Sequence, residues 1–119
     1  MNRKQTGDVG EKVALNYLKK RGYRIRELNF RCREGEVDII AIKKDVLVFI
    51  EVRTKTGADF GTPEESITRT KKAKLVLLGQ VYISQHDNLP LNWRIDFVGV
   101  QLDQNGSVKR IELIENAVS

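Results

Sequence analysis

The most constraining feature of this 119-residue sequence is a pair of apolar segments, residues 39–42 and 46–52, separated by the polar residues 43–45. Both segments are rich in β-branched and aromatic side chains, and the short polar break predicts two antiparallel strands joined by a tight turn. Strands this apolar are usually buried on both faces. Two carboxylates nevertheless accompany them, Asp38 just before the first segment and Glu51 within the second. The sequence therefore predicts a buried hairpin that must accommodate two acidic side chains.

The register of this hairpin decides whether the two carboxylates meet. If Lys44 and Asp45 form a two-residue turn, Asp38 lies directly opposite Glu51, with Cβ atoms ~5 Å apart. Like charges that face each other across strands are destabilising, and burial increases the cost. Arg53 follows Glu51 by two residues and therefore points to the same face. A facing pair of this kind suits a hard divalent ion such as Mg²⁺, whose other ligands are water and substrate phosphate.

The same residues allow an ordinary structural interpretation. In this alternative, both carboxylates lie at strand ends in solvent, and Glu36 forms a surface ion pair with Arg53. Spacing alone leaves the metal site and the surface ion pair open. Asp96, a third carboxylate within an apolar strand, is expected to pair with Arg94 or with a basic group of another strand.

Composition places only broad limits on function. The chain has the length of one domain, expected to cover residues 1–119, and its single cysteine excludes an internal disulfide and a cysteine zinc cluster. No apolar run approaches the ~20 residues of a membrane span, and the N-terminal residues do not have the pattern of a signal peptide. A cytoplasmic protein is therefore expected. The formal net charge of +5 indicates a polyanionic partner such as nucleic acid.

The other elements follow from hydrophobic periodicity and turn signals. Residues 6–21 are predicted to form a helix with an apolar stripe of Val9, Val13 and Tyr17, and with Ala14 and Leu18 beside it. The remaining predicted elements are a strand at 23–30, a loop at 54–62, a helix at 62–85 and strands at 93–102 and 107–114. The order is α-β-β-β-α-β-β, which predicts an α/β fold with a mixed central sheet flanked by helices.

The second helix has a recognisable start signal. Thr62 can cap it, Pro63 suits the first helical position, and Glu65 completes a capping box. Phe60 and Gly61 belong to the preceding loop, and Phe60 either packs against the core or stacks on a nucleic-acid base. Lysine and arginine side chains crowd the first half of this helix, where they form either a solvated face or a phosphate-binding one.

Several motifs in this order resemble a known group of nucleases. They are Gly10-Glu11 with Ala14, Asn29-Phe30-Arg31, Gly35-Glu36-Val37-Asp38, Phe49-Ile50-Glu51-Val52-Arg53, Phe60-Gly61 and Arg94-Ile95-Asp96-Phe97. Their order and spacing resemble the PD-(D/E)xK nuclease superfamily and, within it, the bacterial YraN family of predicted endonucleases. The resemblance covers most of the chain. It implies a restriction-endonuclease-like core, similar in fold to Holliday-junction resolvases.

The resemblance also implies roles for individual residues. Glu11, Asp38 and Glu51 would form an acidic cluster, in which Asp38 and Glu51 hold Mg²⁺ or Mn²⁺ and Glu11 assists directly or through water. The usual lysine of the superfamily falls on Arg53. Arginine stays protonated and cannot act as a general base, although it can stabilise charge on a phosphate. Lys55, on the same face, would take over part of the lysine role if the strand extends that far.

The resulting hypothesis is a metal-dependent endonuclease that hydrolyses phosphodiester bonds, with structured or branched DNA as the expected substrate. Its expected catalytic residues are Glu11, Asp38, Glu51 and Arg53. The residues expected to bind nucleic acid are Arg31, Arg33, Lys55, Lys71 and Lys72. Two alternatives stay open: a nucleic-acid-binding module that keeps the fold without cleaving, and a structural or regulatory protein whose acids only form ion pairs. No membrane partner is expected, and analogy with junction resolvases indicates a homodimer.

Overall fold

The computed structural model describes residues 1–57 and 63–118 of the chain. Its elements are α1 (Arg3–Lys20), β1 (Arg24–Cys32), β2 (Gly35–Lys43), β3 (Val46–Thr56), the 3₁₀ helix η1 (Pro63–Ser66), α2 (Arg69–Gln85), β4 (Asn92–Leu102) and β5 (Val108–Ile114). This order confirms the predicted α/β fold with a mixed sheet. No helix in the described ranges is long and apolar enough to cross a membrane.

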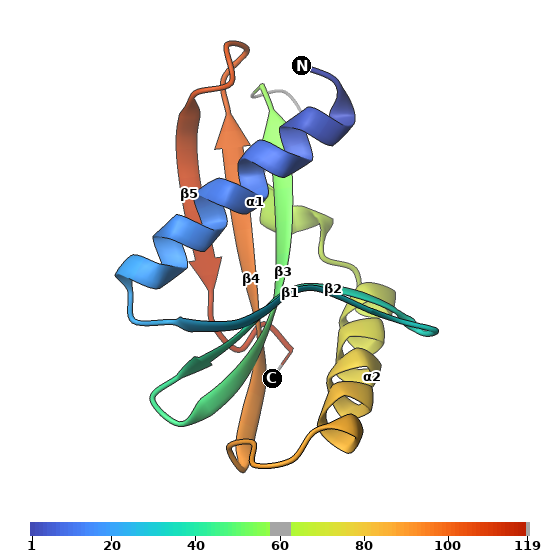
Figure 1. The fold of residues 1–119 in the computed structure, drawn as a ribbon. Helices are drawn as coiled ribbons and strands as arrows, with labels where there is room; N and C mark the ends of the chain where they lie inside the picture. Colours follow the sequence, from blue (N-terminus) through green and yellow to red (C-terminus); the bar gives the residue numbers. More distant parts are fainter. Residues whose placement is uncertain (58–62, 119) are drawn as a thin grey trace.

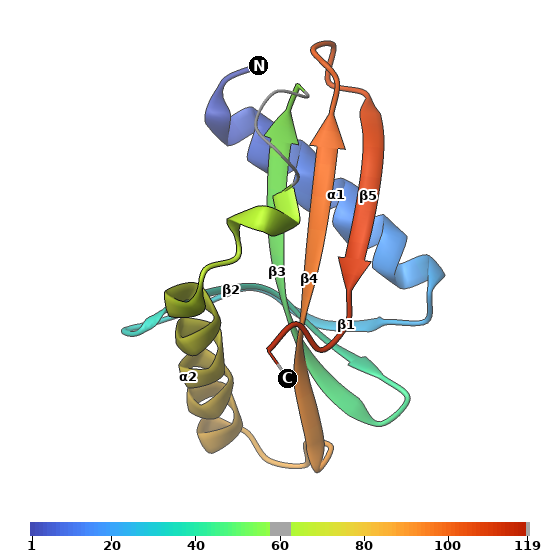
Figure 2. The same ribbon diagram turned by 180° about the vertical axis from the view of Figure 1, so that it is seen from behind.

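The five strands form one sheet in the order β1-β2-β3-β4-β5. Of the four neighbouring strand pairs, only β3 and β4 are parallel. The segment with η1 and α2 lies between them in the chain and returns it to the end of the sheet at which β3 begins. Helix α1 crosses one face over β3 and β4, as Figure 1 shows. Helix α2 packs against β2 on the other face (Figure 2). The sheet therefore separates two apolar cores, one beneath each helix.

Helix α1 begins earlier than predicted, and it buries the residues expected beside the apolar stripe, Ala14 and Leu18, more fully than the stripe itself. Asn2 caps it through a reciprocal pair of hydrogen bonds with Gln5, at 2.8 and 2.9 Å. The buried side of α1 consists of Gly10, Ala14 and Leu18. The predicted stripe flanks this contact and is only partly buried: Val9, Val13 and Tyr17. Small residues at positions 10 and 14 bring the helix axis close to the sheet, which a stripe of larger side chains would prevent.

Replacing Gly10 by Ala is expected to lower the free energy of unfolding by about 1–3 kcal/mol, because its new methyl group would overlap the Thr54 side chain. Gly7 is a matched control on the same helix, since a Cβ there would have no atom within 4 Å. Gly7→Ala is expected to raise the free energy of unfolding by up to ~1 kcal/mol through helix propensity. Urea unfolding followed by circular dichroism measures both effects. Equal effects of the two substitutions would contradict the close approach at Gly10.

The second helix starts later than the sequence signal predicted. Residues Pro63–Ser66 form the short 3₁₀ helix instead, and α2 begins at Arg69. Thr68 has an extended backbone and caps α2, because its hydroxyl accepts a hydrogen bond from the Lys71 N–H at 3.1 Å. The chain thus contains two cap signals, and the later one starts the α-helix. The predictions for Phe60, Gly61 and Thr62 lie outside the described residues.

The β2–β3 hairpin has the predicted register. Lys44 and Asp45 form its two-residue turn with positive φ angles of 47° and 63°, as a type I′ turn requires. Among the described residues the ladder ends where Ile39 pairs with Ile50, although both strands continue beyond that pair. We call this point the strand fork. It lies directly beside the two carboxylates of the hairpin.

A fully buried carboxylate at Asp96 belongs to the framework of the fold. It accepts hydrogen bonds from the Tyr23 hydroxyl at 2.7 Å and from Arg94 Nε at 2.9 Å. The backbone N–H of Asn116 donates a further one, at 2.9 Å. Asp96 therefore joins β4 to the chain before β1 and to the chain after β5, with the predicted partner Arg94 among its contacts.

Candidate metal and phosphate site

Asp38 and Glu51 meet at the strand fork. Glu51 is only 6% exposed, and Asp38 is half-buried. Asp38 Oδ2 accepts a hydrogen bond from the Val52 N–H at 2.8 Å, so this carboxyl group replaces the backbone partner that β3 loses at the fork. The Asp38 carboxyl, when protonated, donates a hydrogen bond to the Glu51 carboxylate. The structure therefore brings the two sequence-predicted acids into contact.

Two cations contact the buried carboxylate of Glu51. Lys71 Nζ lies 2.6 Å from Glu51 Oε2, and Arg53 Nε lies 3.3 Å from the same oxygen. The alternative of a surface ion pair between Glu36 and Arg53 is not what the structure shows, because Glu36 pairs with Arg31 at 3.3 Å. Neither does Glu51 lie in solvent at a strand end. Acidic and basic side chains instead lie together in one partly buried site.

Arg53 has a hydrogen-bond donor that the protein leaves unused. Its Nε is buried and has no hydrogen-bond partner, because the contact with Glu51 is an ion pair without hydrogen-bond geometry. A buried donor of this kind costs about 1–3 kcal/mol when it is left unsatisfied. The Arg53 side chain as a whole is 40% exposed, so a bound anion such as a phosphate can approach it.

Glu11 reaches the same region from α1. It lines a cavity together with Asp38. Burial raises the pKa of Glu11, and the charges of Glu36, Asp8 and Glu51 raise it further. Within the described part of the chain, no three His, Cys, Asp or Glu side chains form a group that could bind one metal. The candidate protein ligands for a metal are therefore Asp38 and Glu51, and the charge of Glu11 raises the pKa of Asp38.

Burial disfavours two negative charges on the Asp38–Glu51 pair. Burial and then the charge of Glu51 raise the pKa of Asp38 from its usual 3.8 to about 8, against the opposing effect of the Val52 hydrogen bond. Burial also raises the pKa of Glu51, although Arg53 and the hydrogen bond from Asp38 oppose this. At neutral pH the two carboxyl groups thus share a proton. Adjacent carboxyl groups that share a proton fit a hard divalent ion, which would displace that proton.

The position of Lys71 on Glu51 was not predicted from the sequence, where Lys71 was expected only to bind nucleic acid. It lies one turn before Leu75 on the buried side of α2, which continues through Leu78 and Tyr82. A lysine that extends an apolar stripe is the signal that could have found it. Its position in the first turn opposes the helix dipole, and contact with Glu51 offsets that cost.

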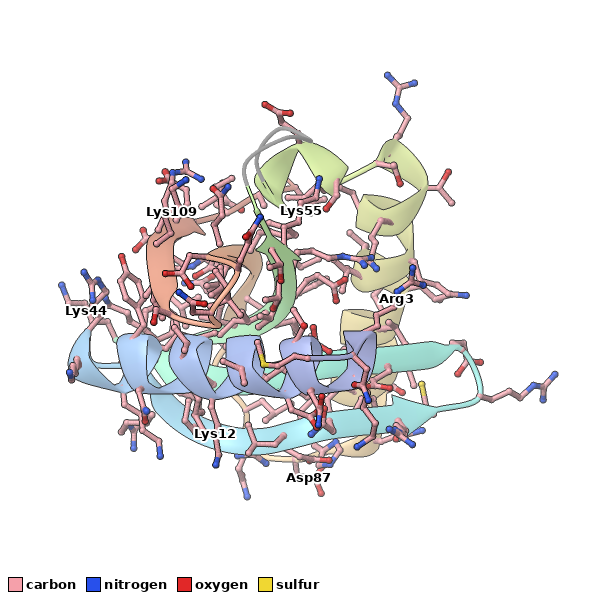
Figure 3. All side chains as sticks on the ribbon, turned by 90° about the horizontal axis from the view of Figure 1, so that it is seen from above. Arg3, Lys12, Lys44, Lys55, Asp87 and Lys109 are labelled. Carbon is pink, nitrogen blue, oxygen red and sulfur yellow. The ribbon has the colours of Figure 1, made fainter. Side chains whose placement is uncertain are left out.

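The other predicted nucleic-acid-binding residues are more widely spread. Arg31 is exposed and pairs with Glu36, and Arg33 is exposed at the β1–β2 turn. Lys55 lies near the end of β3, as Figure 3 shows, two residues beyond Arg53. Lys72 follows Lys71 and is half-buried. Of the five residues predicted to bind nucleic acid, Lys71 is the one that the structure places on the acidic pair.

The fork lies in the part of the chain that known relatives share. The family described as "Uncharacterised protein family UPF0102" matches residues 10–100, a range that includes Glu11, Asp38, Glu51 and Lys71. This chain belongs to the UPF0102 family. UPF0102 proteins of Dehalococcoides mccartyi, Caldanaerobacter subterraneus and Pelotomaculum thermopropionicum are 49%, 41% and 44% identical to it. The alignments cover 98%, 98% and 97% of this chain and 95%, 97% and 96% of the relatives. Membership of UPF0102 confirms the YraN-like family predicted from the motifs.

Proposed function

We propose that this UPF0102 protein is a divalent-metal-dependent nuclease of the PD-(D/E)xK superfamily that hydrolyses phosphodiester bonds in structured or branched DNA. The observation that supports the proposal most is the contact of Asp38 with Glu51 at the strand fork, with Lys71 and Arg53 on the same carboxylate. Oxygen ligands for a metal and cations for a phosphate are the groups that phosphodiester hydrolysis requires.

The residues of the site divide into metal ligands and phosphate-binding groups. Asp38 and Glu51 would hold Mg²⁺ or Mn²⁺, and the Val52 N–H orients the Asp38 carboxyl group. The bound metal supplies a Lewis acid that polarises the phosphate and lowers the pKa of a water ligand. Arg53 and Lys71 bind phosphate oxygens and stabilise the negative charge that grows on them during hydrolysis.

Glu11 and Lys71 have additional roles in the proposal. Glu11 lines the cavity beside Asp38 and orients a water molecule there. Lys71 supplies a lysine beside the second acid, whereas the superfamily usually has one two residues after that acid, where this chain has Arg53. Its role in the proposal is that of a positive charge next to Glu51 that binds a phosphate oxygen.

A second candidate function is a nucleic-acid-binding module that keeps the fold but does not cleave. The observation that favours it is that Lys71 and Arg53 already neutralise Glu51 without any metal. In that case the acidic pair would only position basic side chains for phosphate binding. A third candidate, a structural or regulatory protein, would use the same contacts only as ion pairs.

Metal titration and a cleavage assay separate these candidates. Isothermal titration calorimetry with Mg²⁺ and Mn²⁺ is expected to show one binding event that Asp38→Ala removes. The metal-loaded protein is then incubated with branched, flapped and single-stranded DNA, and cleavage of at least one of them is expected. DNA binding without cleavage under both metals would favour the binding module. Absence of both metal binding and DNA binding would favour the structural protein.

The affinity for Mg²⁺ is expected to rise about tenfold for each pH unit between pH 6 and 8, because the metal must displace the proton that Asp38 and Glu51 share. Titrations in buffers with different ionisation enthalpies count the protons released, and about one per bound metal is expected. As a control, Asp38→Ala should release none. A pH-independent affinity for Mg²⁺ would show that the metal binds elsewhere.

A further inference from the structure

Two cavities of similar size meet at Asp38. The first, which we call the α1 cavity, has a volume of about 430 Å³ and is lined by Arg3, Gly7 and other residues of α1. The second, the α2 cavity, has a volume of about 410 Å³ and is lined by Lys74, Leu75 and other residues of α2. Both volumes fall within the ~300–1,000 Å³ that is usual for small-molecule sites, so each can hold about one nucleotide.

The two cavities lie on opposite faces of the sheet. Only Asp38, Val52 and Arg53 line both of them within the described residues. The α1 cavity lies on the α1 face and the α2 cavity on the α2 face, and these helices cover opposite sides of the sheet (Figures 1 and 2). The strand fork, where pairing between β2 and β3 ends, lies at the residues that line both cavities.

Each cavity is also lined by a basic side chain from the helix that covers it. Arg3 is exposed at the start of α1, and Figure 3 shows it at the end of that helix that is nearer to α2. Lys74 is exposed on α2, one turn beyond the helix start, and lines the other cavity beside Leu75 and Leu78.

We propose that one unpaired nucleic-acid strand passes through the strand fork, with the two nucleotides beside the scissile phosphate in separate cavities and with Arg3 and Lys74 on the flanking phosphates. This inference rests on the proposed nuclease function. A strand that crosses from one face of the sheet to the other must bend sharply at Asp38. Duplex DNA resists such a bend, with a persistence length of about 150 base pairs, whereas a single strand does not. The substrate class is therefore unpaired nucleic acid, including the unpaired arms of flaps and bubbles.

Binding is measured without cleavage so that the test stays independent of catalysis. Fluorescence anisotropy in metal-free buffer compares an oligonucleotide of about 12 nucleotides, its blunt duplex and a duplex with a central bubble. The single strand and the bubble are expected to bind at least tenfold more tightly than the blunt duplex. Arg3→Ala and Lys74→Ala are each expected to weaken single-strand binding about threefold to tenfold. Each should also reduce the slope of log affinity against log salt by about 0.7, the value for one phosphate contact on a single strand.

Two matched controls remove a single charge elsewhere. Lys19→Ala changes the opposite end of α1, and Lys109→Ala changes β5, which Figure 3 shows on the side away from α2. Both are expected to leave single-strand affinity within twofold of the unmodified protein. Circular dichroism verifies that all four variants are folded.

Failure of this inference is distinguishable from failure of the proposed function. Equal or tighter binding of the blunt duplex would overturn the crossing strand, even if the protein cleaves DNA. It would also be overturned if Arg3→Ala or Lys74→Ala changed single-strand affinity no more than the controls do. Conversely, the expected binding pattern in a protein that never cleaves would support the two cavities and contradict the nuclease.

Discussion

Replacing Asp38 by Asn is expected to reduce Mg²⁺-dependent cleavage by about 10³-fold or more. A bound metal contributes several kcal/mol of transition-state stabilisation, and each 1.4 kcal/mol corresponds to about tenfold in rate. Asparagine keeps the size of aspartate and can still accept the hydrogen bond from the Val52 N–H, so the strand fork is retained. What the substitution removes is an anionic metal ligand. Cleavage is measured under single-turnover conditions with saturating metal.

The same substitution is expected to make the metal-free protein more stable at high pH. The pKa of Asp38 is raised to about 8 in the folded protein, so the folded state holds a proton that the unfolded state loses near pH 4. Stability from this group is therefore full below pH 4 and is lost as pH rises toward 8, by at most about 1.4 kcal/mol for each pH unit. The asparagine side chain does not ionise, so the variant should lack this loss. The difference between the two proteins should be small at pH 5 and largest above pH 8.

Urea unfolding at pH 5, 7 and 9 in the presence of a chelator tests this stability prediction. Asp87→Asn is the control, because Asp87 is exposed in the turn after α2 and does not line either cavity. The control should follow the unmodified protein at every pH. A variant that is less stable than the unmodified protein at pH 9 would contradict the shared proton between Asp38 and Glu51.

Replacing Lys71 by Met is expected to lower the cleavage rate about 10²–10³-fold, which is the usual effect of removing one group that stabilises transition-state charge. The free energy of unfolding should also fall, because the Glu51 side chain is only 8% exposed and loses one of its two cations. Arg53 stays on Glu51 and limits the loss to about 1–3 kcal/mol. Rapid-quench cleavage and urea unfolding measure the two effects. Lys109→Ala, on the distant strand β5, should change neither.

Lys71→Arg separates the charge of this residue from its proton. If Lys71 only holds phosphate, the arginine variant should cleave at nearly the normal rate. If it also exchanges a proton, kcat should fall while KM stays nearly unchanged, because arginine keeps the charge but does not titrate. A fully active Lys71→Met variant would show that the contact with Glu51 is only structural, and that Arg53 suffices for catalysis.

Much of the hairpin was predictable from sequence because its constraints are local. Side chains alternate along a strand with period two, and a two-residue turn leaves only one register between the segments it joins. The structure has that register, and Asp38 and Glu51 meet as a result. The end of the ladder at Ile39 and Ile50 was not predictable in the same way. That break opens the fork and lets Asp38 line cavities on both faces.

Helix contacts were less predictable because they depend on partners far away in the chain. Val9 and Val13 are more apolar than Gly10, yet the glycine lies at the centre of the contact because Thr54 leaves no room for a side chain. The start of α2 was misplaced for a related reason. Two cap signals compete there, and local sequence does not say which of them the packing of Leu75 selects.

The amino-acid sequence by itself determined the order of elements, the register of the β2–β3 hairpin and the identity of the two acids, since each depends on neighbours within a few residues. Only the tertiary structure decided that a second cation, Lys71, reaches Glu51 beside Arg53. Lys71 lies on Glu51 because α2 starts at Arg69 and packs its apolar side against the sheet. That position is set by the burial of side chains from distant segments, and no spacing within the chain encodes it directly.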